Sequence, residues 1–227
     1  MIRSLSDANL KKYVESQLNT FFPDADKVVL DEHYVVATLK RVDHCFSFVT
    51  LKHYLNGQET IFNHLYSDHY VMFVWYLSNQ IFRSKGKNTI SDKLYYLNKT
   101  LHGLDCMYDT KLPDIFLIFH GVGTMLGKAE YSNYFVALQG CTIGSHKGKY
   151  PIMGQGVSLT AHSSIIGDCN IGNNVSISAY TNIFQADIAD NNVVYRSKKG
   201  EIVIANNSIP YAQQFFNVDL HSLANII

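Results

Sequence analysis

Few side chains in this sequence have types and spacing that could do chemistry, and the most informative of them is a histidine. His120 stands in the stretch Phe-His-Gly-Val-Gly-Thr. A histidine has a pKa near neutrality, so it can take the proton of a hydroxyl group as that group attacks. An acidic side chain on the other ring nitrogen would fix its tautomer and stabilise the imidazolium. General-base catalysis is therefore one chemistry that the sequence offers.

The cysteines offer no comparable chemistry. None of the four forms a C-x-x-C pair, and none has a histidine at zinc-finger spacing; they are Cys45, Cys106, Cys141 and Cys169. A disulfide scaffold does not fit a chain of 227 residues with so few cysteines. We therefore expect no structural metal site and no disulfide framework.

Composition excludes several classes of protein. Lys plus Arg and Asp plus Glu number 19 each, and this balance argues against nucleic-acid or anionic-membrane binding. With 47% apolar and 17% charged residues, the chain is not disordered throughout. The longest apolar run, residues 70–77, is far shorter than the roughly 20 residues of a membrane span. Residues 1–19 do not read as a signal peptide. We expect a cytoplasmic protein without a membrane span.

The elements that must position these residues fall into two kinds. Up to about residue 110 the apolar spacing predicts helices near residues 10–21, 30–42, 68–83 and 91–101. Ser6 or Asp7 would cap the first helix, Pro23 would follow its end, and Gly103 would stop the last. The third is apolar on most of its circumference, which is typical of a buried helix.

A period of six replaces the helical spacing after Pro113. Its lead positions are apolar throughout, and compact residues usually stand four positions later. The leads are Phe119, Met125, Tyr131, Ala137, Ile143, then after an insertion Met153, Leu159, Ile165, Ile171, Ile177 and Ile183. Such units stack as three short strands per coil, with the lead side chains inside. The spacing favours a β-solenoid over an ordinary β-sandwich.

We accordingly expect an α+β protein with an α-helical domain, residues 1–110, and a solenoid domain, residues 111–195. Residues 196–227 would form a C-terminal tail.

Residues 138–144 read Leu-Gln-Gly-Cys-Thr-Ile-Gly, and Tyr150-Pro151-Ile152 follows a short loop. This resembles the left-handed β-helix hexapeptide acyltransferases, and most of all serine acetyltransferases. That family has a similar Leu-Gln-x-Val-Thr-Leu-Gly, a glycine-rich loop and Arg-His-Pro-Lys-Ile. The resemblance covers residues 100–195, is weaker in the helical part, and implies a left-handed parallel β-helix.

The resemblance also implies catalytic residues. His120-Gly-Val-Gly-Thr looks like the family's His-Ala-Thr-Gly, whose histidine is the catalytic base. Fifteen residues earlier, Leu104-Asp105 matches the family's Val-Asp, whose aspartate holds that histidine. His120 would thus be the general base and Asp105 its orienting partner. Alternatively, His120 would be a turn histidine whose hydrogen bonds are satisfied locally, and Asp105 would only cap the end of a helix.

The acceptor site departs from the family's pattern. Phe119 replaces the aspartate that helps to hold the serine amino group, and Lys149-Tyr150 replaces the Arg-His that helps to bind the serine carboxylate. Lys149 could meet an anion, although not with bidentate geometry, and Tyr150 suits a sugar ring. Asp68 could supply a replacement acid, or it could simply cap the buried helix.

Coenzyme A would lie along the solenoid wall between neighbouring subunits, as the resemblance implies. Ala161 and Ala179 stand 18 residues apart, where the family has small Gly-Ala-Gly turns, and they would stack in successive coils. Gly144 and Ser145 would line the same groove, and Lys198 could meet the coenzyme phosphates. Alternatively, the alanines simply suit a tight corner, and Lys198 is an exposed, solvated lysine, so that neither binds a ligand. The insertion 145–150 would lie over the mouth of the active site.

The resemblance implies an O-acetyltransferase that uses acetyl-CoA and no metal. The acceptor that we expect is a sugar hydroxyl in surface polysaccharide or glycan biosynthesis. The alternative acceptor is serine, in cysteine biosynthesis. A non-catalytic β-helix scaffold remains open. A solenoid carbonic anhydrase would need zinc at His120, His146 and His162, which only flexible loops could bring together.

The coenzyme groove implies a cyclic homotrimer, or a dimer of trimers paired through helices that include Trp75. Serine acetyltransferases commonly end in a tail that closes in isoleucine and docks into a sulfhydrylase. This chain ends in Asn225-Ile226-Ile227, so the sequence leaves open whether it binds a sulfhydrylase. If the tail binds such a partner, deletion of Ile227 would abolish the complex in a pull-down.

Overall fold

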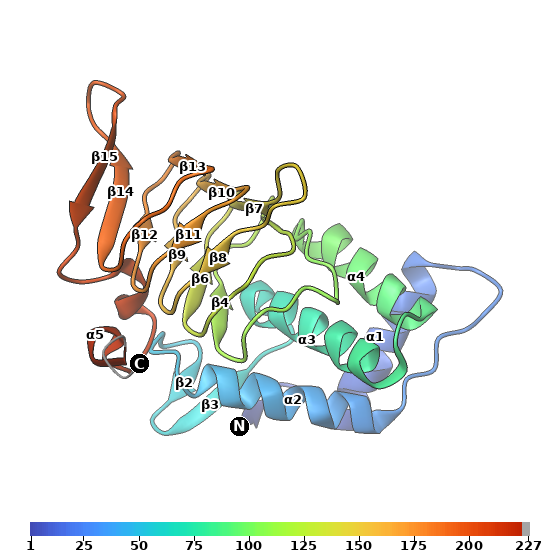
Figure 1. Cartoon of the computed structure of the whole chain (residues 1–227). Coiled ribbons are helices and arrows are strands. Elements are labelled where there is room, and N and C mark those ends of the chain that lie inside the picture. The colour runs from blue at the N-terminus through green and yellow to red at the C-terminus, as the bar shows by residue number, and fades with distance from the viewer. Residues whose placement is uncertain (224–227) are drawn as a thin grey trace.

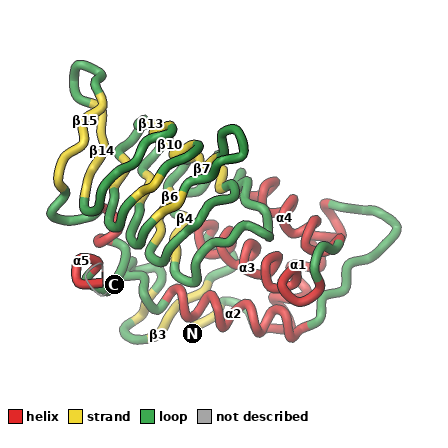
Figure 2. The backbone as a smooth tube through the Cα atoms, viewed as in Figure 1, coloured by secondary structure: helices red, strands yellow, loops and turns green. Residues whose placement is uncertain are grey.

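The computed structural model describes residues 1–223, in which a helical half is followed by a parallel β-solenoid (Figures 1 and 2). The helices of the first half are α1 (Asp7–Phe21), α2 (Glu32–Phe46), α3 (Ser67–Lys85) and α4 (Thr89–His102). This half also contains a small sheet of β1 (Ile2–Arg3), β3 (Glu59–Phe62) and β2 (Leu55–Asn56). The sequence predicted the four helices but not this sheet.

Local capping explains where the helices begin and end. Ser6 caps α1 by accepting a hydrogen bond from the Asn9 amide at 3.3 Å. Gly103 ends α4 in the left-handed conformation, with φ of +67°. The start of α4 lies a few residues before the predicted Ser91, because the Asn88 side chain accepts from the Ser91 amide at 2.9 Å.

The solenoid presents three faces of short parallel strands. The long face holds β4 (Phe116–Ile118), β6 (Phe135–Ala137), β9 (Ser158–Leu159), β12 (Ser176–Ile177) and β14 (Asn192–Arg196). The middle face holds β5 (Met125–Leu126), β7 (Thr142–Gly144), β10 (Ser164–Ile166) and β13 (Asn182–Phe184). The short face holds β8 (Ile152–Met153) and β11 (Asn170–Ile171).

The strand register confirms the solenoid and corrects its first coil. Ile143, Ile165 and Ile183 stand in register on the middle face and are buried, as the period predicts. Leu126 rather than Met125 continues this column, and Met125 is 50% exposed. On the long face the displacement is one residue in the opposite direction: Ile118 pairs with Ala137, and both are buried, so Phe119 lies outside the interior column.

The helical half closes one end of the solenoid through α3 (Figure 1). The Trp75 and Tyr76 rings lie 5.4 and 5.2 Å from the ring of Phe116 in β4. Trp75 is only 2% exposed within its own chain. The Trp75 ring is therefore covered by the protein's own core, and pairing of two trimers through these helices stays a prediction.

The C-terminal part folds back instead of forming a simple tail. β14 and β15 (Ile202–Asn206) form an antiparallel hairpin that projects from the last coil (Figure 1). The chain then returns through the 3₁₀ turn η1 (Tyr211–Gln214) and α5 (Leu220–Leu223) to the helical half. The closing Asn225-Ile226-Ile227 lies outside the described residues.

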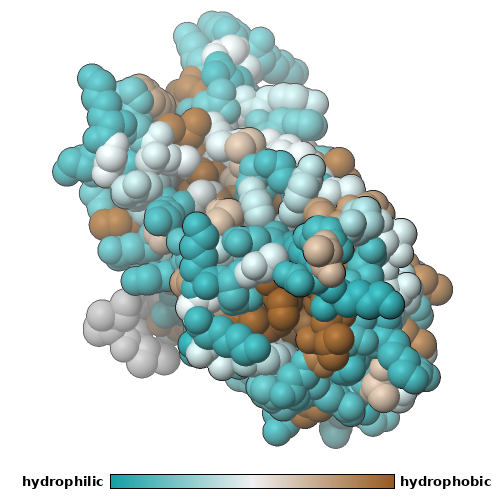
Figure 3. Space-filling model, turned by 90° about the vertical axis from the view of Figure 1, so that its right-hand side faces the viewer, coloured by the Kyte–Doolittle hydropathy of each residue, from teal (hydrophilic) through white to brown (hydrophobic). Residues whose placement is uncertain are grey.

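The surface of the helical end is mostly hydrophilic, with a patch of hydrophobic residues in its middle (Figure 3). Exposed apolar side chains in this half include Phe21 and Val29. Within residues 1–223, no helix is both long and apolar enough to cross a bilayer.

Candidate active site

His120 lies in the turn that follows β4, and its backbone is held in an uncommon conformation. Its φ is +55°, in the left-handed region that few residues other than glycine adopt. The next residue must be small, because a Cβ atom at Gly121 would collide with Cγ2 of Ile118. The His120 side chain is 63% exposed. The turn therefore fixes the backbone of His120 while its ring reaches solvent.

Asp68 is the carboxylate that meets His120. It lies in the first turn of α3, and its side chain is only 6% exposed. One carboxylate oxygen accepts a hydrogen bond from the His120 amide at 3.1 Å, and the other lies 3.4 Å from His120 Nδ1. A single side chain thus contacts both the backbone and the ring of His120.

The charge of Asp68 is set by opposing effects. Burial raises the pKa of this carboxyl group above its usual value, whereas the neighbouring His120 ring and amide lower it. Asp68 also stands at the N-terminus of α3, where the helix dipole favours a negative charge. On balance the pKa of Asp68 is raised, and the contact with His120 favours the ionised form of this buried acid.

A small cavity of about 170 Å³ opens beside this pair. Its lining comes from the start of α3, the end of α4 and the His120 turn: Ser67, Asp68, Val71, Leu101, His102, His120, Gly121 and Val122. Burial lowers the pKa of His102 to about 4, so His102 is neutral at pH 7. No lysine or arginine is among these lining residues. Nothing in the sequence pattern pointed to His102.

Asp105, the expected partner of His120, is engaged elsewhere. Its carboxylate accepts hydrogen bonds at 2.7 Å from Lys99 Nζ and from the Tyr95 hydroxyl, both on α4. Burial alone would raise the pKa of Asp105, but these two donors outweigh it and the pKa is lowered. Within residues 1–223 the Asp105 carboxylate makes no ion pair with His120. The last turns of α4 thus supply the cation and hydroxyl that hold Asp105.

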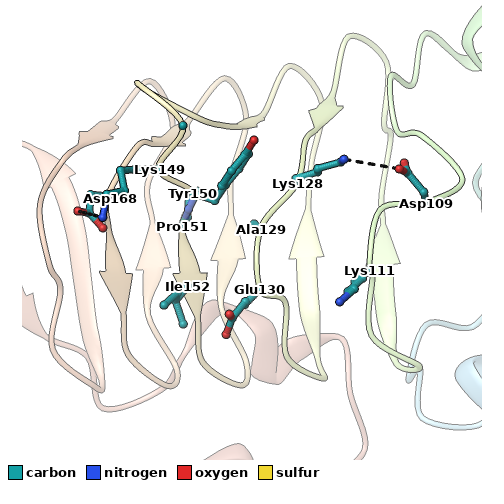
Figure 4. Close-up of a pocket in the computed structure, with 11 residues that line it drawn as sticks. Asp109, Lys111, Lys128, Ala129, Glu130, Lys149, Tyr150, Pro151, Ile152 and Asp168 are labelled. Atoms are coloured by element: carbon teal, nitrogen blue, oxygen red, sulfur yellow. Dashed lines mark ion pairs between the residues drawn. The ribbon is translucent and has the colours of Figure 1, made fainter.

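Lys149 and Tyr150 line a second and larger cavity of about 620 Å³ on the solenoid (Figure 4). Figure 4 shows Tyr150 between two ion pairs, Lys149 with Asp168 and Lys128 with Asp109, each with an N–O distance of 3.7 Å. This cavity shares no lining residue with the cavity beside His120. Within one chain, the predicted acceptor residues therefore fall into two separate places.

Four of the residues expected to bind the coenzyme, all but Lys198, border the middle face. Ala161 and Ala179 lie in stacked turns, with the Tyr180 amide donating to the Ala161 carbonyl at 3.0 Å. Gly144 is at the other end of the same face, where Ser145 opens the insertion. Lys198 lies in the connection of the projecting hairpin and is exposed. Binding of coenzyme A by these residues stays a prediction.

The stacked turns also carry an exposed pair of rings that the sequence pattern did not reveal. His162 and Tyr180 lie 5.1 Å apart between ring centroids and are nearly parallel. Both have a positive φ, of +58°. The His162 ring covers Gly140, where a Cβ atom would collide with it. The repeat spacing of 18 residues between His162 and Tyr180 was the available signal.

No group of three His, Cys, Asp or Glu side chains within the described residues is arranged to hold a metal ion. His146, one of the three histidines considered for zinc, instead packs its ring against Phe184 at 4.9 Å.

Comparison with known proteins identifies the fold. No protein-family model matches the chain, and no curated protein matches it in sequence. Among solved structures, serine acetyltransferase from Neisseria gonorrhoeae has a TM-score of 0.66 at 17% identity, over 90% of this chain and 82% of that chain. Its complex with serine has a TM-score of 0.63 at 18% identity, over 83% and 82%.

A serine acetyltransferase solved with coenzyme A has a TM-score of 0.58 at 14% identity, over 76% of this chain and 75% of that chain. These likenesses extend over the helices as well as the solenoid, and they confirm the α+β class and the structural resemblance expected from the repeat. The chain therefore has the fold of the serine acetyltransferases, a helical domain followed by a hexapeptide-repeat β-helix.

Proposed function

We propose that this protein is an acetyl-CoA-dependent O-acetyltransferase with His120 as its general base. The observation that carries the proposal is the contact of exposed His120 with buried Asp68, in a fold shared with serine acetyltransferases. One of these similar proteins was solved with coenzyme A. A non-catalytic scaffold would account for the bond of Asp68 to the His120 amide, but it gives no role to the contact of Asp68 with the exposed ring.

The chemistry follows from the two ring nitrogens. With Nδ1 of His120 protonated and facing Asp68, Nε2 carries the lone pair that can accept the acceptor's hydroxyl proton. The hydroxyl oxygen then forms its bond to the acetyl carbonyl carbon of acetyl-CoA. The carbon–sulfur bond breaks, and the imidazolium returns its proton to the departing thiolate. Asp68 stabilises the imidazolium during these steps.

Asp68 takes the orienting role that the sequence assigned to Asp105. Support for this assignment comes from the 3.4 Å contact of Asp68 with His120 and from the engagement of Asp105 by Lys99 and Tyr95. Asp105 then serves to join α4 to the first solenoid coil, where its amide donates to the Thr124 carbonyl at 2.9 Å.

Serine is the acceptor that we favour. The cavity of about 170 Å³ beside His120 suits a small molecule, and a similar protein was solved with serine. Asp68 also places a negative charge there, although Phe119 has replaced the acid next to the histidine. A sugar hydroxyl is the second candidate, because Tyr150 and Lys149 line a much larger cavity of about 620 Å³.

The test is release of coenzyme A thiol from acetyl-CoA, measured with L-serine and with a panel of sugars and nucleotide sugars. Serine-dependent release supports serine acetyltransferase activity. Release with a sugar and none with serine would identify the sugar hydroxyl as the acceptor. No release with any acceptor, from protein that is folded by circular dichroism, would refute the proposed activity.

We further propose that the working protein is a cyclic homotrimer. The cavity beside His120 contains an acid and a base but no lysine or arginine, whereas Lys149 and Tyr150 lie in a separate cavity of the same chain. A second copy could bring the two sets together, since cyclic assembly repeats one contact between different surfaces.

A further inference from the structure

The C-terminal strap, residues 207–223, runs from the last solenoid coils back to the helical half (Figure 1). At its beginning, the Asn207 amide donates to the Asn191 carbonyl at 2.7 Å. The Asn207 side chain and the Tyr211 amide both donate to the Ser176 hydroxyl, at 3.1 and 2.9 Å. These bonds attach the start of the strap to the solenoid.

The middle of the strap is bound to the loop that follows α2. The Thr50 amide donates to the Phe215 carbonyl at 2.8 Å, and the Asn217 amide donates to the Phe48 carbonyl at 2.9 Å. Between these bonds the strap pairs with Val49 as an antiparallel bridge. The strap therefore forms a second connection between the two halves of the molecule, separate from the chain segment that follows α4.

Two neighbouring phenylalanines of the strap point to different partners. The Phe215 ring lies 5.7 Å from the ring of Phe119, and the Phe119 ring lies 4.0 Å from that of His120. The Phe216 ring instead lies 5.4 Å from the ring of Tyr134. Both strap phenylalanines are buried, at 4% and 1% exposure. Only Phe215 thus contacts the residue that precedes His120.

The outward position of Phe119 makes this contact possible. Because Ile118 fills the solenoid interior, the Phe119 ring is left on the outside and is only partly buried. Phe215 covers it there. The turn that follows has an unfavourable positive φ at His120, so it depends on its surroundings to hold that conformation.

We propose that the strap is a positioning element for the active site and that Phe215, through Phe119, holds the His120 turn in its working geometry. This inference rests on the proposed function for its effect on catalysis. Reacting groups must be placed to within fractions of an ångström, so loss of support behind the turn lowers the rate of the chemical step. The strap carries no reacting group, so it leaves acetyl-CoA binding unchanged.

The test compares Phe215→Ala with the matched control Phe216→Ala. The first readout is hydrogen exchange of the His120 amide, which reports the bond to Asp68 and needs no activity. The second is kcat and KM for acetyl-CoA in the thiol-release assay. Phe215→Ala is expected to speed exchange at least about tenfold and to lower kcat about 10- to 100-fold, with KM within about twofold.

Phe216→Ala should lower the urea midpoint to a similar extent and leave both readouts near those of the wild type. If Phe215→Ala proves unfolded, Phe215→Leu compared with Phe216→Leu gives the same test with smaller effects in the same direction. Equal effects of the two substitutions, or no effect of the Phe215 change, would overturn the positioning role. If Phe215→Ala alone speeds exchange of the His120 amide while the wild type shows no transferase activity, the positioning role stands and the proposed function is refuted.

Discussion

At the scale of single residues, the two contacts of the Asp68 carboxylate determine what His120 can do. The contact with the amide holds the turn, and the contact with Nδ1 orients the ring. Because Asp68 is buried and His120 is exposed, the acid is shielded from water while the base remains accessible. This division suits a general base that must meet an acceptor from solution.

The first prediction separates the two aspartates. Asp68→Asn should lower kcat by about 10²-fold or more, because the neutral amide can no longer stabilise the imidazolium. Asp105→Asn should change kcat less than about threefold, since Asp105 pairs with Lys99 and Tyr95. Steady-state kinetics of both variants measure this. The reverse order of effects would restore Asp105 as the orienting residue.

The same Asp68 substitution has an expected signature in stability. Burial raises the pKa of Asp68 in the folded protein, so the charged form makes the fold less stable as the pH rises through that value. Asparagine removes the charge and can still accept the His120 amide. Asp68→Asn should therefore unfold at pH 7 at the same or a higher temperature than the wild type.

The sequence predicted the candidates at this scale but not all of their pairings. His120 and Asp68 stood out as residues with possible roles, although 52 positions separate them. Whether Asp68 or Asp105 faces His120 depends on how α3 and α4 pack on the first coil. No spacing within either segment contains that information.

At the scale of elements, α3 and α4 bring a buried histidine, His69, and a half-buried one, His102, to the neighbourhood of the site. Burial lowers the pKa of His69, at the start of α3, and of His102, at the end of α4, to about 4 in each case. The His69 Nδ1 atom accepts a hydrogen bond from the Asn63 amide at 3.1 Å, which fits its neutral form. Both rings therefore stay uncharged in the folded protein at neutral pH.

These histidines predict a loss of stability in mild acid. The unfolded chain takes up protons below the ordinary histidine pKa of 6.5, whereas the folded protein does so only near 4. The free energy of unfolding should thus fall as the pH drops from about 6.5 to 4, by up to roughly 3 kcal/mol for each histidine. Urea midpoints at several pH values measure it, and His69→Phe should flatten the dependence. A midpoint constant over this range would contradict the lowered pKa of both rings.

The elements themselves were largely predictable, for different physical reasons. Helical periodicity and the caps Ser6 and Gly103 are local signals, and the structure follows them. The repeat also predicted the solenoid, but its frame was displaced at Phe119 and Met125 because both positions of each adjacent pair are apolar. The small sheet depends on pairing between distant segments, which local pattern does not reveal.

At the scale of the whole molecule, burial protects all four cysteines. Burial raises the pKa of Cys45 to about 11 and that of Cys106 to about 12, so few thiolates form at neutral pH. A thiol reagent such as DTNB should therefore label fewer than one cysteine per native chain, and all four after denaturation. Rapid labelling of native protein would show that the core opens.

Assembly is the second property of the whole molecule that can be tested. Sedimentation equilibrium should give a mass of three times the chain's 25.7 kDa, or twice that value for a pair of trimers. Lys149→Ala should then lower activity while the mass stays unchanged, if Lys149 completes a neighbour's site. A fully active monomer would show instead that the site is complete within one chain.

The most direct test of the account is thiol release from acetyl-CoA by the wild type and by His120→Asn, with L-serine as the acceptor and water alone as the blank. Asparagine preserves polarity and tolerates the positive φ of the turn, so the fold should survive. We predict serine-dependent release by the wild type and a loss of about 10²- to 10⁴-fold in the variant. Release that falls less than tenfold in the variant would contradict the role of His120 as the base.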